Sequence, residues 1–151
     1  MKPKPQPEFI RGEFFIRGEI PSKKNGKMLI TRDGKGNTLD RPRTITNPTA
    51  QSLLRGIELQ AKAAWRGKPT LTNAYIELTF HVSHLAADMD NKCASCCDSF
   101  VKAGILRTDS MKHVRREVLE WVLVRPDEIG VMVRIRGEAY YEKPRTSRRA
   151  A

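Results

Sequence analysis

The segment from Ala74 to Val82 constrains the fold more than any other. Apolar side chains alternate with polar ones along it, and Ile76, Leu78 and Phe80 share one parity. This alternation is typical of a strand with one buried face. A helical pattern follows at residues 91–102. A half-buried strand that leads into an amphipathic helix predicts a domain in which helices pack on a sheet.

The predicted helix has two chemically different faces. Its apolar face collects residues at helical spacing, namely Cys93, Cys96, Cys97, Phe100 and Val101. We assign Asn91, Lys92, Ser95, Asp98, Ser99 and Lys102 mostly to the other face. Asp98 and Lys102 are spaced to pair at i, i+4. Gly104 is suited to the left-handed position just past the helix end.

Acidic residues flank this helix. If the extended backbone continues to residue 90, Asp88 and Asp90 project to the same side of it, because side chains repeat every two residues. Asp90 is then expected to be the N-cap. The turn at 105–109 is expected to bring Asp109 beside them. Such carboxylates suit Mg²⁺ or Mn²⁺. The spacing alone is equally consistent with acids that only end a strand and cap a helix.

The overall charge favours a polyanionic partner. The 151-residue chain has 28 Lys and Arg against 17 Asp and Glu, and a formal net charge of +11. Basic side chains that contact phosphates give nucleic-acid affinity without reading sequence. Acids clustered in so basic a chain indicate a divalent metal that faces a polyanion. The compact basic loop at 22–27 is a candidate phosphate-binding segment; a plain solvated loop is the alternative.

The acidic motif resembles a known family. The run Asp88-Met89-Asp90-Asn91, then Asp98, Lys102-Ala103-Gly104 and Asp109, resembles the RusA family of Holliday junction resolvases. The loop Pro21-Ser22-Lys23-Lys24-Asn25 is similar to a family loop. The resemblance implies a homodimeric endodeoxyribonuclease that resolves four-way DNA junctions by paired symmetric nicks in recombination and repair. It also implies that Asp88, Asp90 and Asp109 are the catalytic acids that bind Mg²⁺ or Mn²⁺.

The chain also departs from the family pattern. Ala94 stands where family members often have a catalytic lysine, and Thr108 where they often have another acid. Lys102, or a lysine of the 23–24 pair, is a candidate replacement. The alternative function is therefore a non-catalytic DNA-binding protein on a decayed nuclease scaffold. In both cases the expected DNA-binding residues are Lys23, Lys24, Asn25, Lys27, Arg41, Arg43, Lys92 and Lys102.

The remaining segments complete one predicted domain. We expect strands at 9–20, 28–31 and 38–46, and a helix at about 48–66 that is capped by Thr46 or Asn47 and anchored in the core by Trp65. Residues 114–124 and 131–140 are expected to pair as a hairpin. The predicted fold is α/β (α+β), with a mixed sheet of about four to six strands and two main helices. The domain spans 9–141, between an extended lead-in at 1–8 and a basic tail at 142–151.

Other function classes find little support. No apolar run approaches the roughly 20 residues that span a bilayer, and no G-x-x-x-x-G-K-[ST] motif predicts a nucleotide cofactor. The N-terminus lacks the apolar core of a signal peptide. Cys93, Cys96 and Cys97 with His81 and His84 are a weak zinc candidate, because the two histidines differ in strand parity. Reduced core thiols in a cytoplasmic protein are the favoured interpretation.

Overall fold

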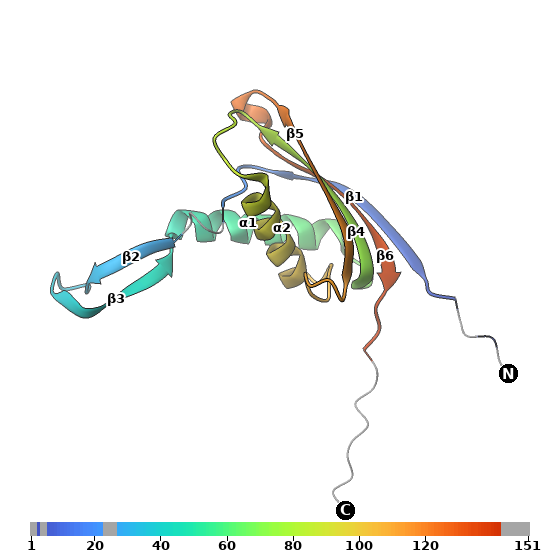
Figure 1. Ribbon diagram of the computed structural model, residues 1–151, viewed down its shortest axis with the longest axis horizontal. Helices are drawn as coiled ribbons and strands as arrows, with labels where there is room; N and C mark the ends of the chain where they lie inside the picture. The colour runs from blue at the N-terminus through green and yellow to red at the C-terminus, as the bar shows by residue number, and fades with distance from the viewer. Residues whose placement is uncertain (1–2, 4–5, 23–26, 143–151) are drawn as a thin grey trace, which may run out of the picture.

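The computed structural model describes residues 3, 6–22 and 27–142, with the backbone alone at 27, 28, 45 and 46. These residues form a mixed α+β fold with six strands, two α-helices and one 3₁₀ turn (Figure 1). In chain order they are β1 (Phe9–Arg17), β2 (Lys27–Arg32), β3 (Thr38–Thr46), α1 (Pro48–Ala64), β4 (Leu71–Val82), α2 (Met89–Lys102), β5 (Val114–Leu123), η1 (Pro126–Glu128) and β6 (Gly130–Ala139).

Four of the strands form one mixed sheet in the order β1-β6-β4-β5. The pairs β1–β6 and β6–β4 are antiparallel, whereas β4–β5 is parallel. The predicted hairpin of 114–124 with 131–140 is therefore wrong, because β4 lies between β5 and β6. Most of β5 is exposed, with charged residues on both parities. Such a strand is tolerated at the sheet edge, and the apolar β4 takes the interior position.

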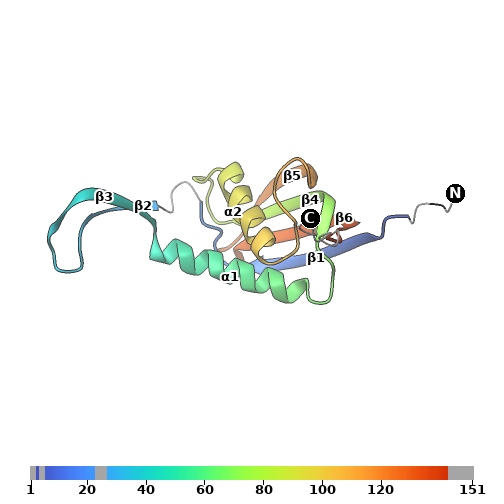
Figure 2. The ribbon, with the colours of Figure 1, turned by 90° about the horizontal axis from the view of Figure 1, so that it is seen from below.

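The core lies between one face of this sheet and the two helices (Figure 2). The predicted alternation of β4 is confirmed, since Ile76, Leu78 and Phe80 are at most 1% exposed. On the opposite face, Glu77 of β4 and Arg134 of β6 are exposed. The helices thus cover only the apolar face of the sheet.

Helix α1 begins and ends as its sequence predicts. The Asn47 side chain caps it by accepting a hydrogen bond from the Thr49 amide at 2.9 Å. The indole of Trp65, which is only 3% exposed, donates to the Pro69 carbonyl at 2.9 Å. Its ring covers Gly12 of β1 so closely that a Cβ there would lie 2.2 Å from the ring. Trp65 therefore anchors α1 on the sheet.

The strands β2 and β3 form a separate antiparallel ribbon that extends away from the body (Figure 1). Asp33 organises its tip by accepting hydrogen bonds from the amides of Lys35 and Asn37, both at 2.9 Å. These bonds lower the pKa of Asp33. Across the described segments, neither helix is both long and apolar enough to cross a membrane.

Candidate metal centre beside helix α2

The start of α2 differs from the prediction. Strand β4 ends at Val82, a loop follows, and Asp88 rather than Asp90 is the N-cap. Asp90 lies in the first helical turn. Because the helix begins at Met89, the backbone is not extended through Asp90, so the expectation that Asp88 and Asp90 lie along one extended strand is wrong. The Asp88 carboxylate makes no capping bond and accepts from the Asn91 side chain at 3.4 Å.

The end of α2 is a tight turn that brings the chain to the start of β4. Gly104 has a φ of 80°, as its predicted role requires. The amide of Gly104 donates to Val101 at 3.1 Å and that of Ile105 to Phe100 at 2.9 Å, which is a Schellman motif. Leu106 then forms a parallel bridge with Leu71 of β4. This bridge holds one end of the segment that contains Asp109 and leads to β5.

Two of the three predicted acids border one hollow. Asp90 and Asp109 border a depression of about 290 Å³ between α2 and β5, together with Cys93, Ala94, Cys97, Glu117 and Leu119. Asp88 borders a neighbouring depression of about 220 Å³ beside Val82 and Lys92. In the described part of the chain, Asp88, Asp90 and Asp109 do not form a group with all ligand atoms within 4.8 Å of one another.

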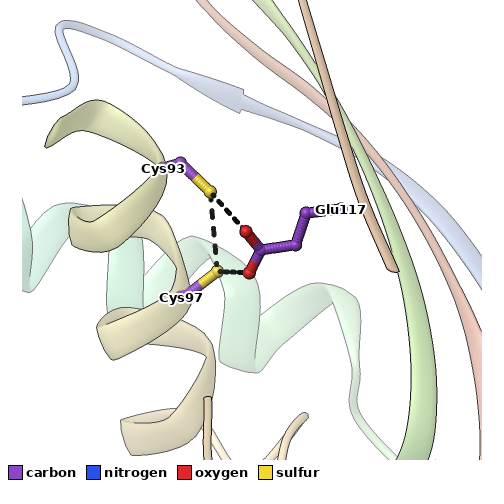
Figure 3. Close-up of side chains that lie close together, drawn as sticks. All are labelled: Cys93, Cys97 and Glu117. Atoms are coloured by element: carbon purple, nitrogen blue, oxygen red, sulfur yellow. Dashed lines mark hydrogen bonds between the residues drawn. The ribbon is translucent and has the colours of Figure 1, made fainter. Parts of the chain in front are cut away.

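A tighter cluster lies on the wall of the same hollow (Figure 3). The sulfurs of Cys93 and Cys97 are 3.9 Å apart; that of Cys93 lies 3.6 Å from Oε2 of Glu117, and that of Cys97 lies 3.6 Å from Oε1. Both cysteines are buried, at 4% and 3% exposure. The contact with Cys93, and then burial, raise the pKa of Cys97.

The sequence analysis did not identify Glu117. A signal was present, because Glu117 shares its strand parity with Leu119, Trp121 and Leu123 and therefore faces the helices. The register pairs it with the buried Ile76 of β4. An acid at a helix-facing position, followed on the same parity by three apolar residues, indicates a polar partner on the facing helix. Here that partner is the pair of thiols on α2.

Three residues assigned to the polar face of α2 are buried instead: Lys92, Ser95 and Ser99. The Lys92 ammonium donates to the Ile20 carbonyl at 2.7 Å, and the Ser95 hydroxyl donates to Pro21 at 2.6 Å. Burial lowers the pKa of Lys92. The predicted polar face was wrong for these residues because the chain that follows β1 packs on it. These bonds tie the start of the 21–25 loop to α2.

The other basic candidates lie in three settings. Arg41 and Arg43 are exposed on β3, and Lys102 is exposed in the last turn of α2. Lys23, Lys24 and Asn25 fall outside the described residues, as does the tail from 143 to 151, and the Lys27 side chain is not described. Their contact with DNA stays a prediction.

The histidines do not join the cysteines. His81 packs edge-on against Phe15, with ring centroids 5.1 Å apart, and His84 accepts from the Ala86 amide at 3.4 Å. The candidate zinc set that includes these histidines is therefore wrong. His113, close in sequence to Asp109, is 8% exposed and lies 2.9 Å from the Thr72 hydroxyl. It is a packing residue.

The donor atoms around the hollow are of two kinds. Asp90, Asp109 and Glu117 offer carboxylate oxygens, which fit Mg²⁺ and Mn²⁺. Cys93 and Cys97 offer sulfur, which those ions bind poorly and Zn²⁺ binds well. By donor type the oxygens therefore suit the cation that the sequence predicts and the sulfur pair does not, although within the described residues these three carboxylates do not form a group with all ligand atoms within 4.8 Å of one another.

Comparisons with known proteins give little further guidance. No protein-family model matches the sequence, and no curated protein matches it. Among solved structures, the fold is similar to 2C-methyl-D-erythritol 2,4-cyclodiphosphate synthase from Plasmodium vivax, at 8% identity and a TM-score of 0.34. The match covers 89% of this chain and 98% of that one. A likeness of this size carries no argument about the present fold or its chemistry.

Proposed function

We propose that the chain is a metal-dependent, structure-specific endodeoxyribonuclease of the RusA type that resolves four-way DNA junctions. The observation that carries the proposal is that Asp90 of α2 and Asp109 of the segment between α2 and β5 border the same hollow. Both belong to the three acids, with Asp88, that the resemblance of the 88–109 motif implies. The net charge of +11 supports a DNA partner.

In this proposal Asp90 and Asp109 hold Mg²⁺, with Mn²⁺ as a substitute, and Asp88 is a ligand on the resemblance alone. When bound, such an ion activates a water and stabilises the charge that develops on the scissile phosphate. Glu117 adds a carboxylate on the β5 side of the hollow. The exposed Lys102, Arg41 and Arg43 are proposed to contact phosphates of the junction.

A homodimer is part of the proposal, because paired nicks on opposed strands need two sites. The edge strand β5 offers a surface for a partner. Trp121, Val122 and Leu123 are 46%, 41% and 58% exposed. Adjacent apolar side chains on an unpaired strand edge favour association.

The test is cleavage of a labelled synthetic four-way junction with Mg²⁺, with Mn²⁺ or with EDTA. The proposal expects metal-dependent paired nicks. Changes next to metal ligands typically lower metal affinity or activity 10–100-fold. Asp90→Asn and Asp109→Asn should therefore each lower the cleavage rate at least about 100-fold, while junction binding is retained. Asp127→Asn, an exposed aspartate in η1, is the matched control and should cleave normally.

The second candidate, a DNA-binding protein that does not cut, is favoured by Ala94 and Thr108. Ala94 is exposed and borders the hollow, so Ala94→Lys would place an ammonium at the position of the family lysine. If the nuclease is active, Ala94→Lys is expected to raise its rate. Binding without cutting in either metal, by both the wild type and Ala94→Lys, would favour the second candidate.

A further inference from the structure

The side chains of Cys93, Cys97 and Glu117 converge from two elements (Figure 3). The two cysteines are one helical turn apart, and both are buried beside the strand that carries Glu117. Sulfur, sulfur and carboxylate oxygen are a donor set of the kind that zinc sites use. The set needs no histidine. Its two sulfurs are separate from the Asp90 and Asp109 pair, and Glu117 borders the hollow that both sites share.

The separation of the two sulfurs fits a tetrahedral ion. With Zn–S bonds of about 2.3 Å and Zn–O bonds of about 2.0–2.2 Å, tetrahedral angles place two sulfurs about 3.8 Å apart and a sulfur and an oxygen about 3.5–3.7 Å apart. Here the sulfurs are 3.9 Å apart, Cys93 lies 3.6 Å from one Glu117 carboxylate oxygen, and Cys97 lies 3.6 Å from the other. The sulfur–sulfur separation thus matches two ligands of a tetrahedral ion, and a monodentate Glu117 would present one of its two oxygens to both sulfurs.

We propose that Cys93, Cys97 and Glu117 form a binding site for a borderline-soft divalent cation, with Zn²⁺ as its ligand. Three protein ligands leave a fourth position, which is typical of zinc sites that keep a water or exchangeable ligand. Because the cluster lines the hollow that Asp90 and Asp109 border, this position is open to water in the hollow. The site does not depend on the proposed nuclease activity.

Binding converts both thiols to thiolates, and their protons pass to the buffer while Glu117 stays ionised. Nothing is oxidised or reduced. Protons compete with the metal for the two thiolates, so the affinity for Zn²⁺ is expected to rise with pH. Bound Zn²⁺ would cross-link α2 to the edge strand β5, and the net charge of the cluster would not change, because two protons leave as one Zn²⁺ binds.

Hydrogen bonds offer a simpler account of the same contacts. Each thiol is close enough to donate to one oxygen of Glu117, and such a cluster needs no ion. This account predicts no stoichiometric metal binding, so a binding experiment separates the two.

The full-length chain, chelated and fully reduced, is titrated with Zn²⁺ alone and, in parallel, with Co²⁺ as a spectroscopic probe. The proposal expects one equivalent of Zn²⁺ per chain, proton release on binding, and a thiolate-to-cobalt charge-transfer band with the intense visible bands of tetrahedral Co²⁺. Cys93→Ser and Cys97→Ser are each expected to weaken Zn²⁺ binding at least about 100-fold, and Glu117→Gln about 10–100-fold.

Cys96→Ala is the matched control, since Cys96 is buried on the same helix but lies outside the cluster. It should retain both the Zn²⁺ affinity and the cobalt spectrum. Absence of the charge-transfer band in the wild type, or Zn²⁺ binding unchanged in folded Cys93→Ser and Cys97→Ser, would overturn the proposal. Circular dichroism of each variant establishes that it is folded. Because no DNA is present, failure here leaves the nuclease proposal standing, and failure to cut DNA leaves this site standing.

Discussion

The two helices cover the same face of the sheet but are held differently. In α1, three of 17 residues are buried, and all three are apolar. In α2, seven of 14 residues are buried, and Lys92, Ser95 and Ser99 are among them. Within the described residues, no buried side-chain nitrogen or oxygen lacks a hydrogen-bond partner. A helix fixed by polar bonds on one side and apolar contacts on the other holds its N-terminal acids in place.

The largest predicted difference between the helices concerns their packing. Phe100 of α2 is 0% exposed and contacts the Phe14 ring edge-on at 6.1 Å. Phe100→Ala should lower the free energy of unfolding by about 3–5 kcal/mol, because it leaves a cavity in the core. On α1, Leu59 is 52% exposed, and Leu59→Ala should change that free energy by no more than about 0.5 kcal/mol. Urea denaturation measures both; equal losses would remove the contrast.

The polar anchoring of α2 is expected to have the next largest effect. Lys92→Met removes the donor of the 2.7 Å bond and leaves the Ile20 carbonyl without it. The expected loss is about 1–3 kcal/mol in the free energy of unfolding. Lys62→Met, in the exposed last turn of α1, should cost less than about 1 kcal/mol. An unchanged or raised denaturation midpoint in Lys92→Met would show that the buried ammonium does not hold α2.

The helix N-termini should differ by a smaller amount. Asn47 makes a capping bond on α1, whereas Asp88 makes none on α2. Asn47→Ala is expected to lower the free energy of unfolding by about 1 kcal/mol, and Asp88→Asn by less than about 0.5 kcal/mol. Thermal melts of both variants suffice. A larger loss in Asp88→Asn would assign Asp88 a structural role that its contacts do not indicate.

The smallest expected effect is a dependence of stability on pH through His113, which lies in neither helix. Burial, and then the charges of Lys112 and Arg107, lower its pKa below 6.5. The unfolded chain therefore takes up this proton at a higher pH than the folded chain does. Stability should then fall as the pH drops from about 6.5 toward the folded pKa. In His113→Asn this part of the slope should vanish, whereas His84→Asn, in an exposed loop, should keep it.

Local patterns in the sequence predicted the elements well. Alternation identified β4, and helical spacing identified the buried Cys93, Cys96, Cys97 and Phe100. Asn47 and Gly104 marked where α1 begins and α2 ends, because caps depend on neighbouring residues only.

Tertiary relations were not contained in those patterns. The position of β4 between β5 and β6 depends on which strand buries the most apolar surface, and a hairpin is only the locally simplest pairing. The burial of Lys92 and Ser95 depends on the carbonyls of Ile20 and Pro21, far away in the sequence. Glu117 was missed for the same reason, since its partners are on another element.

The central claim is that Asp90 and Asp109 hold a single cation in the hollow between α2 and β5. Its most direct test is a double-mutant cycle on Mn²⁺ affinity, measured by titration of the reduced, zinc-free chain with Asp90→Asn, Asp109→Asn and the double variant. For a shared ion, each single change should weaken Mn²⁺ binding strongly. The loss of binding free energy in the double variant should be smaller than the sum of the two single losses, by about 0.5–3 kcal/mol. Losses that simply add, or no loss in either single variant, would contradict the claim.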